Sequence, residues 1–134
     1  MNLLVTPQWS SQNDKFNISS ESAQVVVSAC DTDSKSKDCV VELIKKYAEQ
    51  YGVRVDLAIS IADCESDFKV NARGDSGKAY GIYQFHKPTF DMFSKKLGEK
   101  LDYFSTEDNI KLAMWAMAND KGFHWSCYRK IASR

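Results

Sequence analysis

Two carboxylates in unlike surroundings are the residues of this sequence that could do chemistry. Glu65 stands in Cys64-Glu65-Ser66 at the end of an apolar segment, and Asp75 lies in the glycine-rich stretch Gly74-Asp75-Ser76-Gly77. Cleavage of a glycosidic bond needs such a pair, because one carboxyl must hold a proton near neutral pH while a second group stabilises charge or guides water. The pattern predicts an enzyme that acts on a polysaccharide.

The spacing around Glu65 places its side chain on the apolar face of a helix. Ala58, Ile61, Ala62 and Glu65 stand at i, i+3, i+4 and i+7, and Asp56 is expected to cap the start of this helix. A carboxylate on such a face loses hydration, so its pKa should rise, which suits a general acid. The competing interpretation is a structural salt bridge at a helix end.

The remaining segments must position these two carboxylates. Apolar residues recur every three or four positions over 40–51, which predicts an amphipathic helix that ends at Gly52, with Ser36 or Asp38 as its cap. A third helix is expected to begin at Pro88 and end at Gly98, and a fourth to follow the capping box that begins at Ser105 and to run through 110–118.

The segment between the second and third predicted helices has a different character. Residues 66–86 lack helical periodicity and contain Gly74, Gly77 and Gly81, so they are expected to form a loop or small hairpin. Asp75 lies in this region, where the competing interpretation is an Asx turn that stabilises the loop. The predicted fold class is mainly α, with a small loop or hairpin region bordering a glycan-binding cleft.

Length and composition limit the other possibilities. The chain has 134 residues, and its 18 Lys and Arg balance its 18 Asp and Glu, so no net charge indicates a nucleic-acid partner. No apolar run has the length of a membrane span. We expect a polar N-terminal arm over residues 1–38, a catalytic domain over 39–134 and a monomer.

The four cysteines bear on the compartment in which the protein works. They allow three pairings, of which Cys30 with Cys39 would close a short polar loop, and Cys64 with Cys127 would then tie the glutamate helix to the C-terminal segment. Disulfides favour a periplasmic or extracellular protein whose export signal is missing from this chain, whereas four free thiols would indicate a reducing compartment.

The ordered motifs resemble the catalytic domain of soluble lytic transglycosylases and goose-type lysozymes. Glu65-Ser66, then 71–75, then Gly81-Ile82-Tyr83-Gln84 are similar to the Glu-Ser pair, glycine turn and Gly-Leu-Met-Gln-like segment of that family. The resemblance covers about residues 40–127 and implies a lysozyme-like fold. It also implies cleavage of the β-1,4 bond after N-acetylmuramic acid in peptidoglycan, the expected partner.

The resemblance assigns roles residue by residue. Glu65 matches the family's catalytic acid, and the expected substrate-binding residues are Ser66, Tyr83, Gln84, His86 and Asn119. Goose-type lysozymes have an aspartate at the offset of Asp75, proposed to position water, and a second one where this chain has His86. Asn119 is matched through a segment that departs from the family's Ala-Tyr-Asn-x-Gly pattern, because it lacks the tyrosine.

Three functions remain open on the sequence alone. A lytic transglycosylase would use Glu65 as acid and then base, and would form an anhydro-sugar without water. A goose-type muramidase would hydrolyse the same bond with Asp75 positioning water, and a non-catalytic module would only bind glycan. None of these needs a cofactor, and His86, His124 and the cysteines show no spacing typical of a metal site.

Overall fold

The computed structural model describes residues 35–133, and the predicted N-terminal arm lies almost entirely outside them. The described part contains five α-helices and one three-stranded antiparallel sheet. The helices are α2 (Lys37–Tyr51), α3 (Val55–Ser66), α4 (Lys87–Leu97), α5 (Thr106–Ala118) and α6 (Ser126–Ala132). The strands are β1 (Arg73–Gly74), β2 (Ala79–Tyr80) and β3 (Phe85–His86), and short 3-10 turns η2 (Asp75–Gly77) and η3 (Gly122–His124) complete the unit. The mainly helical fold with a small hairpin region was predicted correctly.

Local sequence signals explain several helix ends. Ser36 accepts a hydrogen bond from the backbone N–H of Cys39 and caps α2, and Ser105 caps α5 by accepting from Asp108. Gly52 and Gly98 end α2 and α4 in the left-handed conformation, as expected of C-cap glycines. The prediction that Asp56 caps α3 is wrong.

The start of α3 explains why Asp56 does not cap this helix. The helix begins at Val55, with Arg54 as the N-cap residue, and no side chain caps it. Asp56 already lies inside the first turn, where its carboxylate accepts two hydrogen bonds from the Arg54 guanidinium. A negative charge in the first turn still favours the helix through the macrodipole.

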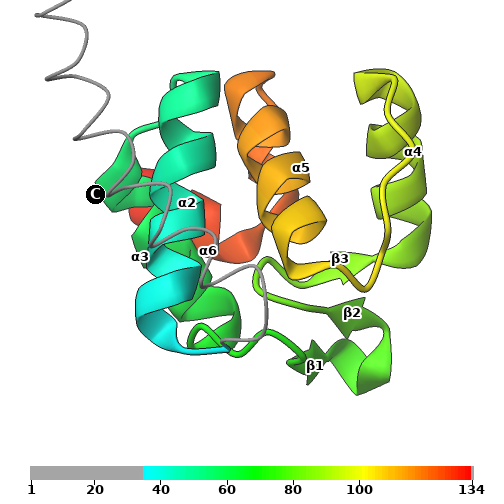
Figure 1. Cartoon of the computed structure of the whole chain (residues 1–134), viewed down its shortest axis with the longest axis horizontal. Coiled ribbons are helices and arrows are strands. Elements are labelled where there is room, and N and C mark those ends of the chain that lie inside the picture. Colours follow the sequence, from blue (N-terminus) through cyan, green and yellow to red (C-terminus); the bar gives the residue numbers. More distant parts are fainter. Residues whose placement is uncertain (1–34, 134) are drawn as a thin grey trace, which may run out of the picture. The chain divides into compact units, whose positions relative to one another are not determined.

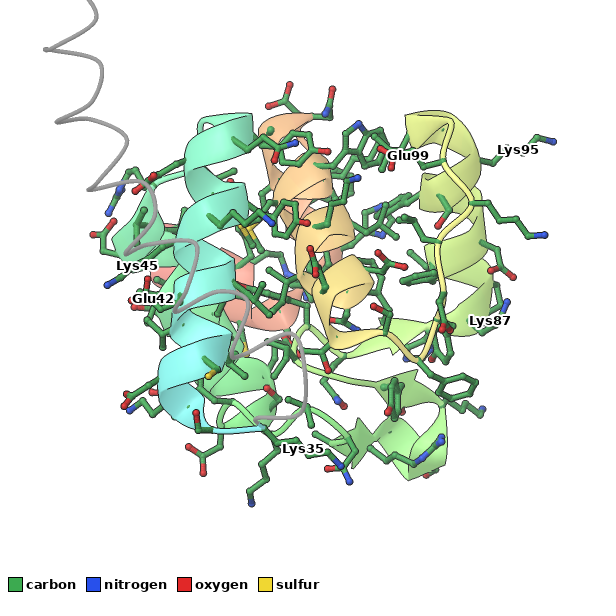
Figure 2. The ribbon with its side chains drawn as sticks, viewed as in Figure 1. Lys35, Glu42, Lys45, Lys87, Lys95 and Glu99 are labelled. Carbon is green, nitrogen blue, oxygen red and sulfur yellow. A yellow bond between two sulfur atoms is a disulfide. The ribbon has the colours of Figure 1, made fainter. Side chains whose placement is uncertain are left out.

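Figure 1 shows α2, α5 and α4 side by side, with the small sheet below α5 and α4. The inward faces of the helices supply most of the core, and its largest fully buried aliphatic side chains are Ile44, Ile61, Ile82, Ile110, Leu112 and Met114. Charged side chains such as Lys45, Lys87 and Lys95 lie at the periphery, where they are exposed (Figure 2). The apolar faces thus pack inward, and α3 packs against α2 and α6.

The C-terminal segment forms a helix that the sequence analysis did not predict. The seven residues of α6 pack on α3, and a disulfide joins Cys127 in α6 to Cys64 in α3. This pairing was one of those expected. Cys39 is also disulfide-bonded, and its expected partner, Cys30, lies outside the described residues.

Candidate active site

A cleft of about 440 Å³ separates the sheet from the C-terminal segment. One wall comes from strands β2 and β3, the turn η2 between β1 and β2, and the start of α4, and the other from the end of α3 and the segment that leads into α6. The lining residues are Glu65, Asp75, Ala79, Gln84, Phe85, His86, Thr89, His124, Trp125 and Ser126. Four residues predicted for the site, Glu65, Asp75, Gln84 and His86, therefore line one cleft.

Glu65 occupies the last turn of α3 and is half-buried. Burial raises the pKa of its carboxyl above the ordinary value. Two interactions partly offset this effect, since the backbone N–H of Cys127 donates to the carboxylate and the positive charge of Lys130 favours the ionised form. The expected rise of the Glu65 pKa is thus found, and its cause is the predicted one.

The Cys64–Cys127 disulfide holds in place the residue whose backbone N–H donates to Glu65. Cys64 immediately precedes Glu65, and its partner Cys127 supplies the N–H that contacts the carboxylate. Cys127 lies in the first turn of α6, where backbone N–H groups lack helical acceptors and readily bind anions. One covalent bond therefore holds both the acid and one of the groups that tune its pKa.

The side chains of Asp75 and His86 pair on the sheet side of the cleft. His86 Nε2 lies 2.8 Å from Asp75 Oδ2, and the two side chains are 44% and 63% exposed. The register of the sheet places His86 opposite Ala79 and Ala79 opposite Gly74, the residue before Asp75. This short hairpin brings together two residues that are eleven positions apart in the sequence.

Gln84 lines the cleft, but its side-chain amide nitrogen binds backbone oxygens of the loop. Its Nε2 donates to the backbone oxygens of Ala72 (2.9 Å) and Gly81 (2.8 Å). A β-carbon on Gly74 would lie 2.5 Å from Gln84 Oε1, so a larger residue there would displace the Gln84 side chain from its present position. Gln84 thus shapes the sheet wall, with its amide nitrogen already satisfied by backbone acceptors.

Tyr83 and Ser66, which were expected to bind substrate, both lie outside the cleft lining. Tyr83 is fully buried, and its hydroxyl donates to the carbonyl of Ala58 at 2.7 Å. Ser66 is also buried and donates to the carbonyl of Ala62 at 3.1 Å within its own helix. Both side chains hold the loop and the helix end in place, and neither lines the cleft.

Asn119 lies at the end of α5 and also stays outside the cleft lining. Its side chain is exposed, and its Nδ2 donates to the carbonyl of Trp115 at 2.8 Å. The amide therefore terminates α5, a local role that agrees with the missing tyrosine in the segment from which Asn119 was assigned.

Two buried residues hold the loop at Tyr83 in place, and the sequence analysis assigned neither of them to the site. Asn109 is buried in α5, accepts from the backbone N–H of Tyr83 at 2.9 Å and donates to the carbonyl of Tyr80 at 3.1 Å. Trp125 is buried, and its Nε1 donates to the carbonyl of Tyr83 at 2.6 Å. Asn109 could have been recognised as a polar residue on the apolar face shared with Leu112.

No helix among residues 35–133 combines the length and the apolarity that crossing a membrane requires. The comparison with curated proteins gave no match. The comparison with protein families matched the Transglycosylase SLT domain over residues 42–123, more than half of the chain. That match spans α2 from Glu42 onward, the whole of α3, the sheet, α4 and α5, and it implies lytic transglycosylase activity on peptidoglycan. The chain belongs to the Transglycosylase SLT domain family.

Proposed function

We propose that this chain is a lytic transglycosylase that cleaves the β-1,4 bond between N-acetylmuramic acid and N-acetylglucosamine, with Glu65 as general acid and then general base. The observation that carries the proposal is the position of Glu65. It is half-buried, lines a cleft that can take part of a polymer, and has a raised pKa caused by burial. A carboxyl kept protonated in this way can donate to a leaving oxygen near neutral pH.

The reaction balances without a second carboxylate. The Glu65 proton moves to the glycosidic oxygen as the bond between that oxygen and C1 of N-acetylmuramic acid breaks, and the substrate's own N-acetyl group stabilises C1. The C6 hydroxyl of the same muramic residue then attacks C1, and the Glu65 carboxylate takes its proton. A 1,6-anhydro sugar forms, water is not consumed, and Glu65 returns to its protonated state.

The Asp75–His86 pair favours this route over hydrolysis. A hydrolase with Glu65 as acid would need Asp75 to orient a water molecule on the other face of the sugar. Because Oδ2 of Asp75 lies 2.8 Å from His86 Nε2, the imidazole already occupies one of the two carboxylate oxygens. One observation supports the muramidase alternative, because Asp75 and Glu65 line the same cleft.

The masses of the products distinguish the two routes. Purified sacculi are digested with the protein, and the released muropeptides are measured by mass spectrometry. We expect products that carry no added water, because the C6 hydroxyl replaces water as the nucleophile. Products that each gain one water would show a muramidase, and intact sacculi that nevertheless retain the protein would show a glycan-binding module.

Substitution of His86 tests whether its contact with Asp75 directs the reaction away from hydrolysis. In His86→Ala both oxygens of Asp75 become available to water, so the share of water-added products should rise. Thr89→Ala is the matched control, because Thr89 lines the same cleft and takes no part in the pair. An unchanged product ratio in His86→Ala, at a measurable rate of cleavage, would show that the pair does not direct the route.

The proposed location follows from the disulfide and from the family. The Cys64–Cys127 bond and a cell-wall enzyme domain indicate an extracytoplasmic protein. We propose the periplasm or the extracellular space, where peptidoglycan strands are accessible, and expect the protein to act as a monomer.

A further inference from the structure

An exposed pair of stacked rings extends the cleft on the side of the C-terminal segment. The rings of Phe123 and His124 lie 4.9 Å apart at an angle of 24°, which is a stacked arrangement. His124 lines the cleft, and Phe123, the residue before it in the sequence, is 58% exposed. The stack therefore leads from the cleft onto the protein surface.

Neighbouring groups hold the two rings in position. Phe93 of α4 contacts the His124 ring edge-on at 5.2 Å, and the Arg129 guanidinium donates to the backbone oxygen of Phe123. The next residue, Trp125, is buried and bound to the carbonyl of Tyr83. An exposed phenylalanine on a segment anchored in this way is presented to solvent at a fixed place.

The size of the cleft indicates which ligand binds against the stacked rings of Phe123 and His124. A volume of about 440 Å³ suits a ligand of small-molecule size, whereas the substrate in the proposed function is a long glycan strand. The strand must therefore continue over a rim of the cleft. Large exposed apolar groups beside a cleft are typical of binding surfaces, and a flat ring offers an apolar face to the C–H face of a sugar.

We propose that Phe123 and His124 form a sugar-binding subsite at the rim of the cleft, where the exposed stack holds the apolar face of one N-acetylhexosamine of the strand. This subsite rests on the proposed function for the identity of the strand. It holds a sugar beyond the reacting bond, so it acts on binding and leaves the chemistry at Glu65 unchanged.

The test uses two exposed phenylalanines that differ in place. Neither ring lines the cleft itself, but Phe123 (58% exposed) stacks on His124, which does, whereas Phe104 (60% exposed) contacts Tyr80 and Tyr103. Phe123→Ala should raise KM for soluble glycan strands about 2- to 10-fold with kcat within twofold, the range expected for one lost ring contact. Phe104→Ala should leave both constants unchanged, and Phe123→Trp should restore the wild-type KM.

Binding of uncleaved chitohexaose, measured by calorimetry, separates the subsite from the reaction. Weaker binding to Phe123→Ala than to wild type and Phe104→Ala supports the subsite even if no muropeptide is released, in which case only the proposed function fails. Equal binding to all three proteins, or an equal loss in the two alanine variants, would overturn the subsite. Circular dichroism of each variant verifies that it is folded.

Discussion

Removal of the Cys64–Cys127 disulfide should destabilise the protein strongly. The two cysteines are 63 residues apart, so the bond closes a loop of more than half of the described residues. In the chain-entropy model a loop of this length restricts the unfolded state by about 4 kcal/mol. For a unit of about 100 residues, this loss corresponds to a fall in Tm of roughly 15–30 °C.

The assay is denaturant unfolding of the double variant Cys64→Ala/Cys127→Ala, followed by circular dichroism. Mutation is preferable to a reducing agent, because reduction would also break the disulfide of Cys39. A loss below about 1 kcal/mol, with an unchanged dependence on denaturant, would refute the reasoning. It would mean that the chain is already restricted in the unfolded state, or that α6 is held to α3 by packing alone.

The remaining predictions concern the acid and the loop before the cleft. The charge of Lys130 lowers the pKa of Glu65, so Lys130→Met should raise it and extend activity to higher pH, seen as an upward shift of the alkaline limb of kcat/KM. A shift of the alkaline limb to lower pH would contradict the predicted direction of the pKa change. Gly81→Ala should cost about 2–4 kcal/mol in chemical denaturation, because φ is +86° and the new β-carbon would overlap the Asn109 amide. Gly98→Ala, with a similar φ of +83° and no atom within 4 Å of the β-carbon, should cost only about 1 kcal/mol, and equal losses would contradict the role of the overlap.

Local signals in the sequence predicted the helices and the acid. The apolar spacing that placed Glu65 on the inner face of α3 depends on residues within two turns, and the structure gives the half-buried side chain and raised pKa expected from it. Serine caps and terminal glycines likewise act within four residues, so Ser36 and Gly52 could be predicted from their neighbours.

Contacts between distant segments could not be predicted in the same way. Tyr83 was expected in the cleft because the family resemblance matches it to a cleft-lining position, yet its hydroxyl donates to Ala58, 25 residues earlier in the sequence. His86 and Asp75 pair because two turns of a short hairpin place them together, and nothing in their spacing specifies that register. The short helix α6 has too few residues for helical periodicity to reveal it.

The central claim is that Glu65 supplies the proton for bond cleavage, and the rate at which Glu65→Gln clears a suspension of purified sacculi tests it most directly. The amide has nearly the shape of the acid but cannot donate that proton, so the rate should fall at least about 100-fold. Asp63→Asn, which changes an exposed carboxylate of α3 outside the cleft lining, should keep the wild-type rate. A folded Glu65→Gln variant that clears sacculi within about threefold of the wild-type rate would contradict the account.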